Sequence, residues 1–222
     1  MIPKITKTSS GEILLDGQEL NVRRWTLCPS NQSGVAISAR GAFEHLSKSR
    51  SLRNIVVGII GPRDATNEQM ISAERTAYLL AELGITLICG GKSGVMQAAS
   101  KGCHDAGGLL VGILPGSTPD EANEFVGVPL PTGLGEARNM IIAKSARVLV
   151  AVGGSYGTLS EVAYGLHFSK PVIGLAGAAD VDGVVHMNDP EAAVHAVLEA
   201  LFFCAAHPDS EEGCKITYSA IQ

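Results

Sequence analysis

From residue 54 to residue 205, short apolar runs alternate with segments of helical periodicity, and most of the apolar runs end in glycine. The expected strands are residues 54–60, 85–89, 109–114, 148–152 and 172–175. The expected helices are residues 67–83, 95–106, 136–145 and 159–168, followed by one that starts near Pro190. This alternation predicts a parallel sheet with helices on both faces. We therefore predict an α/β protein with a single doubly wound domain over residues 54–205.

The two ends of the chain differ from this pattern. In residues 1–53, Asp16-Gly17 separates two apolar stretches, which predicts a β-hairpin, and residues 41–48 suit a short helix. This N-terminal β-hairpin extension could pack on the main domain, cover its site or contact another subunit. Residues 206–222 read as a polar C-terminal tail to which we assign no function.

Residues 147–175 form the β-loop-α-β unit with the most informative loop. The β-branched run 148–152 is typical of a buried parallel strand, and it leads directly into the sequence GGSYGT at residues 153–158. Glycines let backbone N–H groups approach a ligand, and the next helix begins with unpaired donors and a partial positive charge. The loop therefore favours a phosphate, with Thr158 as a helix cap or phosphate ligand and Glu161 one turn further on. A tight turn that binds nothing is the alternative interpretation.

Ligands of parallel sheets bind beyond the carboxyl ends of the strands, and glycine-rich or polar loops are expected at five such places here. Arg138 lies near the start of the helix 136–145, where the helix dipole disfavours a cation, so an anionic ligand or a carboxylate would explain it. Asn139, next to Arg138, is a candidate ligand-binding residue, and those of the five loops are Gly61, Gly90, Gly91, Lys92, Ser93, Gly94, Pro115, Gly116, Thr132, Gly133, Gly153, Gly154, Ser155, Tyr156, Gly157 and Thr158.

The stretch Gly91-Lys92-Ser93 invites comparison with the P-loop of nucleoside triphosphatases. That motif, GxxxxGKS, requires a glycine at the position of Thr86, which lies inside an expected strand. The spacing therefore argues against a triphosphatase. A glycine-rich nest for a phosphate or a sugar is the interpretation that we keep.

The composition excludes several classes of function. The net charge of −5 without a basic block, and an aromatic content of 5%, argue against binding to nucleic acid. No apolar run is long enough to span a membrane, and the 6 histidines lack the spacing of a structural metal site. The 5 cysteines show no CxxC pair, which fits a reducing compartment. We expect a cytoplasmic protein without a metal site.

Four stretches resemble the LOG ("Lonely Guy") superfamily, whose members were once mislabelled lysine decarboxylases. They read GGKSGVMQAASKG, LLVGILPG, GEARNMIIAKSA and GGSYGTLSE, and the resemblance spans residues 54–205. It implies a Rossmann-like fold. Molybdenum-cofactor carrier proteins are more distant members, and the forms GGSYGTLSE and ILPG look closer to that branch.

In LOG enzymes the pattern PGGxGTxxE contains the phosphate loop and a catalytic glutamate. By this resemblance Gly154, Gly157 and Thr158 would hold a 5′-phosphate, and Glu161 would be the catalytic carboxylate. The family also has an arginine-lysine pair on the preceding helix, and Arg138 matches the arginine. It would position the ribose or the phosphate.

The chain departs from the LOG pattern at three positions. Asn139 stands in place of the lysine, Gly153 in place of the proline and Ser155 in place of the second glycine. The loss of the lysine weakens phosphate or sugar binding at position 139. It removes neither of the proposed catalytic groups.

Two functions therefore stay open, and both take a phosphorylated small molecule as partner. A phosphoribohydrolase would cleave the N-glycosidic bond of a nucleoside 5′-monophosphate through an oxocarbenium-like transition state, with no cofactor required. The alternative is a non-catalytic carrier that binds the molybdenum cofactor, which also bears a phosphate. In either case the resemblance implies a homodimer or a higher homo-oligomer.

Overall fold

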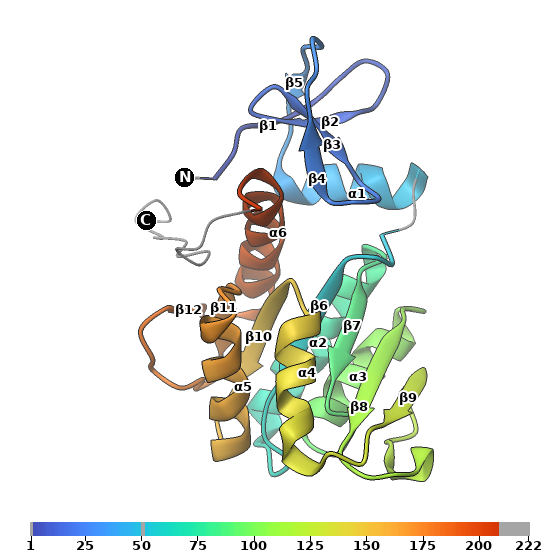
Figure 1. Cartoon of the computed structure of the whole chain (residues 1–222), viewed down its shortest axis with the longest axis vertical. Helices are drawn as coiled ribbons and strands as arrows, with labels where there is room; N and C mark the ends of the chain where they lie inside the picture. Colours follow the sequence, from blue (N-terminus) through green and yellow to red (C-terminus); the bar gives the residue numbers. More distant parts are fainter. Residues whose placement is uncertain (1, 50–51, 209–222) are drawn as a thin grey trace.

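The computed structural model describes residues 2–49 and 52–208 (Figure 1). A small antiparallel sheet with one helix lies at one end of a larger α/β unit (Figure 1). No helix in these two ranges combines the length and the apolar character needed to cross a membrane.

The N-terminal segment is larger than a hairpin. Its strands pair antiparallel in the order β4-β3-β2-β1-β5. The elements are β1 (Ile5–Lys7), β2 (Ile13–Leu15), β3 (Gln18–Asn21), β4 (Thr26–Cys28), β5 (Val35–Ala36) and α1 (Ala39–Ser49). The predicted hairpin is present as β2 and β3, joined at Asp16-Gly17, where both residues have positive φ. The flanking strands span only two or three residues each, too few for an alternating pattern to reveal them.

The larger unit contains a seven-stranded parallel sheet with the order β12-β11-β10-β6-β7-β8-β9. Its strands are β6 (Val56–Ile60), β7 (Thr86–Cys89), β8 (Leu110–Leu114), β9 (Val128–Pro131), β10 (Val148–Val152), β11 (Val172–Leu175) and β12 (Val184–His186). The doubly wound fold is thus confirmed. The two edge strands, β9 and β12, were not predicted. Strand β9 reads VPLP, and its prolines lack the N–H that a central strand needs, so such a strand fits only at an edge.

Helices cover both faces of this sheet (Figure 1). One layer contains α2 (Asn67–Glu82), α3 (Val95–Asp105) and α6 (Pro190–Ala206), and the other contains α4 (Asn139–Ser145) and α5 (Tyr156–His167). Two short 3₁₀ helices, η1 (Pro119–Glu121) and η2 (Gly135–Arg138), lie in the connections. The expected helix 136–145 is therefore divided at Arg138. Helix α5 begins three residues earlier than predicted because the Ser155 hydroxyl accepts a hydrogen bond from the Thr158 N–H.

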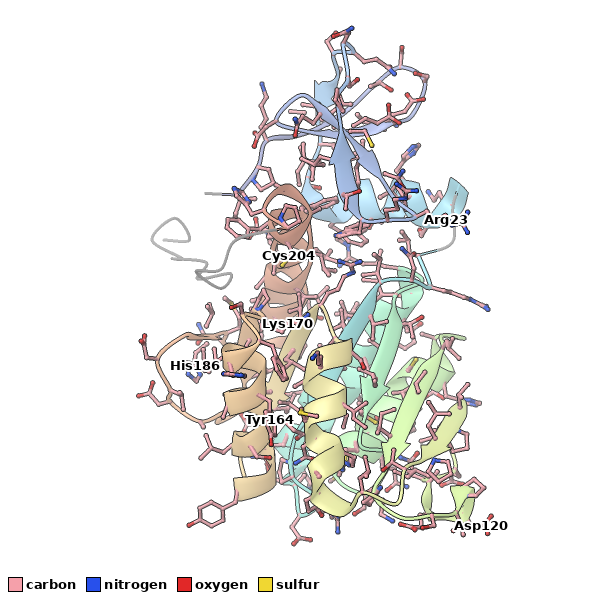
Figure 2. The ribbon with its side chains drawn as sticks, viewed as in Figure 1. Arg23, Asp120, Tyr164, Lys170, His186 and Cys204 are labelled. Atoms are coloured by element: carbon pink, nitrogen blue, oxygen red, sulfur yellow. The ribbon has the colours of Figure 1, made fainter. Side chains whose placement is uncertain are left out.

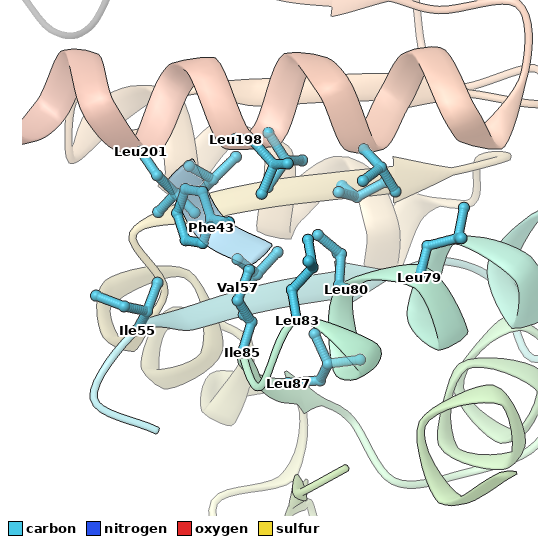
Figure 3. Close-up of a cluster of buried hydrophobic side chains, with 14 of the residues drawn as sticks. Phe43, Ile55, Val57, Leu79, Leu80, Leu83, Ile85, Leu87, Leu198 and Leu201 are labelled. Atoms are coloured by element: carbon cyan, nitrogen blue, oxygen red, sulfur yellow. The ribbon is translucent and has the colours of Figure 1, made fainter. Parts of the chain in front are cut away.

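A common apolar core joins the N-terminal sheet to the α/β unit (Figure 3). The rings of Trp25, Phe43 and Phe202 lie 5.0–5.7 Å apart, and Trp25 Nε1 donates a hydrogen bond of 2.8 Å to the Leu201 carbonyl in α6. This contact is at the end of the molecule where the parallel strands begin (Figure 1). The N-terminal sheet therefore packs on the main unit and does not cover the carboxyl ends of the strands.

Candidate functional site

A cavity of about 620 Å³ opens where the winding of the central sheet reverses. Strands β6 and β10 are neighbours, although the chain forms β7, β8 and β9 between them. The loops that follow β6 and β10 diverge at this point, which leaves a crevice at the carboxyl ends of the strands. The cavity is lined by Gly61, Pro62, Arg63, Asp64, Met96, Glu136, Arg138, Asn139, Gly154, Ser155, Tyr156, Gly157, Thr158, Ser160 and Glu161.

The first turn of α5 forms one wall of the cavity. Ser155 caps this turn by accepting from the Thr158 N–H at 3.2 Å. The N–H groups of Tyr156 and Gly157 lie in the first turn, where the helix has no carbonyl four residues earlier to accept from them. They are therefore available to a ligand. The positive end of the helix dipole adds to their attraction for an anion.

A buried pair of a basic and an acidic side chain lies beside this turn. Arg138 Nη1 is 3.2 Å from Glu161 Oε1, and the two side chains are only 4% and 7% exposed. Arg138 comes from the end of η2 and Glu161 from the second turn of α5, so the pair joins the two elements. A Cβ on Gly90 would lie 2.3 Å from Arg138 Nη2, which explains why this position has no side chain. Gly90 therefore makes room for the guanidinium.

The environment of Glu161 favours its neutral form. Burial raises the pKa of Glu161 from 4.5 to about 8, although the adjacent Arg138 opposes the change. Burial also raises the pKa of the Cys89 thiol, which lies behind the pair, to about 11. Glu161 can therefore exchange a proton near neutral pH, whereas Cys89 remains a thiol.

Asn139 links the start of α4 to the first turn of α5. Its Nδ2 donates to Ser160 Oγ at 2.9 Å and to the Gly157 carbonyl at 3.4 Å. Its Oδ1 is buried and has no hydrogen-bond partner among the described residues, and the same is true of Arg138 Nε. Two adjacent residues of the cavity wall thus have unused hydrogen-bonding capacity.

Arg63 and Glu136 face each other on the lining of the cavity. Arg63 Nη2 is 3.1 Å from Glu136 Oε1, and both side chains are largely exposed. An exposed pair of this kind contributes little to stability. The side chains can therefore separate at small cost when a ligand enters.

The other predicted residues lie outside the lining of this cavity. They are Gly90, Gly91, Lys92, Ser93, Gly94, Pro115, Gly116, Thr132, Gly133 and Gly153. Lys92 Nζ is held 3.2 Å from Glu121 Oε2, in the segment after β8. Figure 2 shows Asp120 of the same segment beside β9, far across the sheet from Tyr164 of α5. A ligand role for these residues stays a prediction.

Six lining residues are not among the candidates selected from the sequence: Pro62, Arg63, Asp64, Met96, Glu136 and Ser160. Ser160 lies inside the GTLSE stretch, between Gly157 and Glu161, so its neighbourhood was already indicated. Met96 lies inside the stretch GGKSGVMQAASKG, but its place in the cavity wall depends on how α3 packs.

Solved structures of two cofactor-binding proteins are similar to this chain. The molybdenum cofactor binding protein of the phototrophic bacterium Rippkaea orientalis has a TM-score of 0.63 and 35% identity, over 66% of this chain and 97% of that one. The molybdenum cofactor carrier protein of Chlamydomonas reinhardtii has a TM-score of 0.62 and 38% identity, over 67% of this chain and 99% of that one. The α/β unit thus corresponds to nearly the whole of each of these proteins.

Among curated proteins, the cytokinin riboside 5′-monophosphate phosphoribohydrolase LOG2 of Arabidopsis thaliana is 33% identical over 122 residues. The match covers 50% of this chain and 55% of the plant enzyme, about half the length of each. Residues 54–200 match the family model described as the SLOG cluster4 family. The resemblance to LOG-like proteins and to the carrier branch is confirmed by these findings.

Proposed function

The chain belongs to the SLOG cluster4 family, and on that premise we propose that its cavity binds a small phosphorylated ligand, with the molybdenum cofactor as that ligand. The observation that carries the proposal is the position of the first turn of α5, whose free N–H groups line a cavity at the switch point of the sheet. A volume of about 620 Å³ lies in the range of ligand pockets.

The phosphate is expected at the amides of Tyr156 and Gly157, within reach of Arg138. A guanidinium and helix N–H groups together form charge-assisted hydrogen bonds to phosphate oxygens. Among the described residues that line the cavity there is no cysteine or histidine. The chain would therefore hold the cofactor by its phosphate and its pterin, as cargo, without a protein ligand to the metal.

Two observations favour the carrier over the hydrolase. The carrier proteins match along nearly their whole length, whereas the match to the plant phosphoribohydrolase covers about half of that enzyme. In addition, Asn139 replaces the lysine of the LOG motif with a neutral residue. This change removes one cation that would contact a phosphate or a sugar.

The buried pair of Arg138 and Glu161 favours a second candidate, a phosphoribohydrolase. When ionised, Glu161 would stabilise the positive charge that develops on the sugar as the N-glycosidic bond breaks. Arg138 would orient the ribose phosphate. Both side chains line the cavity in which the bond would have to lie.

Two measurements on the same purified protein separate the candidates. The first is the pterin retained after expression in a host that makes the molybdenum cofactor, released by heat and oxidation and detected by fluorescence. The second is base release from a panel of nucleoside 5′-monophosphates, followed by chromatography, with Glu161→Gln in parallel. Retained pterin without base release supports the carrier. Base release from the wild type alone supports the hydrolase. If the protein neither retains pterin nor releases base, the proposal is contradicted.

The assembly of the protein stays a prediction. The resemblance implies a homodimer or a larger homo-oligomer, and light scattering of the purified chain would test it. A monomer at micromolar concentration would contradict the prediction.

A further inference from the structure

The two unpartnered polar atoms of the cavity wall are complementary in kind. Arg138 Nε carries a hydrogen and can only donate, whereas Asn139 Oδ1 can only accept. Both residues are 3% exposed and line the same cavity. A buried polar atom without a partner is costly, and native proteins keep few of them. A ligand group that bonds to both atoms would remove the cost.

The orientation of the Asn139 amide follows from its neighbours. The Gly157 carbonyl lies 3.4 Å from the amide and can only accept, so it must face the NH₂ group. The Ser160 hydroxyl donates to the same carbonyl at 2.7 Å, so it is an acceptor for Asn139 Nδ2 at 2.9 Å. Exchanging the amide oxygen and nitrogen would place two oxygens against each other. Oδ1 is therefore the atom left without a partner.

The guanidinium of Arg138 is fixed in a similar way. Nη1 bonds to Glu161, and the backbone at Gly90 lies so close that a Cβ there would meet both terminal nitrogens, at 2.3 and 2.7 Å. The Nη end of the group is thus held by α5 and by the loop after β7. Nε is the buried nitrogen of the group that has no hydrogen-bond partner among the described residues.

We propose that Arg138 Nε and Asn139 Oδ1 together bind a neutral group of the ligand that accepts one hydrogen bond and donates another. The proposal rests on the proposed binding of a phosphorylated ligand at the same cavity. An ionised phosphate has no hydrogen to donate, so it would leave Asn139 Oδ1 unsatisfied and would face its partial negative charge. Position 139 therefore selects for a neutral neighbour of the phosphate, where the LOG motif places a cation.

The contacts of Asn139 indicate where in the ligand this group lies. Asn139 Nδ2 donates to the carbonyl of Gly157, the residue whose N–H belongs to the expected phosphate site, and both residues line the cavity. The recognised group must then be near the phosphate along the ligand. A ribose hydroxyl meets this condition, and so do the ring oxygen and the adjacent N–H of a reduced pyranopterin. The ribose hydroxyl and the pyranopterin would make the same two hydrogen bonds, and the experiment distinguishes them.

The test compares three variants on two probes. Asn139→Leu removes the acceptor, Asn139→Lys introduces the cation of the LOG motif, and Ser160→Ala loosens the amide but keeps the acceptor. The probes are adenosine 5′-monophosphate with its 2′-deoxy and 3′-deoxy forms, by calorimetry, and the pterin retained on purification. Thermal melting confirms that each variant is folded.

We expect Asn139→Leu and Asn139→Lys to weaken binding of the probe by about tenfold, and Ser160→Ala to weaken it by at most about threefold. If the sugar supplies the group, one deoxy nucleotide binds the wild type about tenfold more weakly, and the Asn139→Leu variant no longer distinguishes it. If the pterin supplies it, retained pterin falls in the two Asn139 variants. Tighter binding by Asn139→Lys, or unchanged binding by Asn139→Leu, would overturn the inference and leave the phosphate site standing. Failure of every probe to bind the wild type would overturn both.

Discussion

Replacing Glu161 with glutamine should make the stability of the protein less dependent on pH. The Glu161 carboxyl is 7% exposed, and burial raises its pKa from 4.5 to about 8. Between these two values the unfolded chain releases the proton of this residue while the folded chain keeps it. The free energy of unfolding of the wild type therefore falls as pH rises, by about 1.4 kcal/mol per pH unit from this group alone.

Glutamine has the shape of the neutral carboxyl and does not titrate. All other ionisable groups are common to both proteins, so the difference between their free energies of unfolding reports the titration of Glu161 alone. Relative to the wild type, Glu161→Gln should gain stability by roughly 4 kcal/mol between pH 5 and pH 8. The assay is urea unfolding of both proteins at pH 5, 6, 7 and 8.

A difference in stability that stays constant with pH, or that favours the wild type increasingly at high pH, would show that folded Glu161 does not keep its proton. It would mean that the attraction of Arg138 across 3.2 Å outweighs the cost of burying the charge, and that Glu161 is ionised throughout. The proton exchange inferred for the cavity would then be wrong.

Two further substitutions test the packing around the site and the attachment of the N-terminal sheet. Gly90→Ala should force the Arg138 guanidinium to move, because the new Cβ would lie 2.3 Å from Nη2. We expect the free energy of unfolding, measured in urea, to fall by about 1–3 kcal/mol, and ligand binding to weaken. Unchanged binding would contradict the role given to Gly90. Trp25→Ala should lower the free energy of unfolding by about 3–5 kcal/mol, because a fully buried ring and its hydrogen bond to the Leu201 carbonyl are lost. Trp25→Phe should lower it less. Equal unfolding midpoints for the wild type and Trp25→Ala would show that this contact does not hold the two parts together.

The sequence was sufficient for the parts of the fold that depend on local pattern. Strands β10 and β11 begin and end at the predicted residues, because buried parallel strands are continuous apolar runs. The edge strands were missed because VPLP in β9 lacks donors and β12 has three residues. Their pairing depends on neighbours that are distant in sequence.

In the candidate site too, the local motifs could be predicted from the sequence, whereas the contacts between distant residues could not. The sequence pointed to residues 153–158, Arg138 and Glu161, and the structure brings residues 154–158 to one cavity together with both side chains. The role of Gly90 could not be seen, since it depends on where the guanidinium of a residue far along the chain comes to lie. Lys92 was selected by its glycine neighbours, but Glu121 holds it outside the cavity lining.

Phosphate binding at the first turn of α5 can be tested by removing a single N–H group from this turn. Tyr156 is the first residue of this helix and its side chain is 93% exposed, while Ser155 before it is extended, at φ −149° and ψ 172°. Proline is therefore compatible with position 156 and deletes only the amide hydrogen, apart from the side chain. Tyr156→Ala also removes the side chain but keeps the amide, and so provides the matched control.

Binding of adenosine 5′-monophosphate by calorimetry, and the pterin retained on purification, are compared for the two variants. Tyr156→Pro is expected to weaken binding of the phosphorylated ligand by about tenfold relative to Tyr156→Ala, since one charge-assisted hydrogen bond to the phosphate is lost. Equal binding by the two variants would show that the phosphate is not held at this turn.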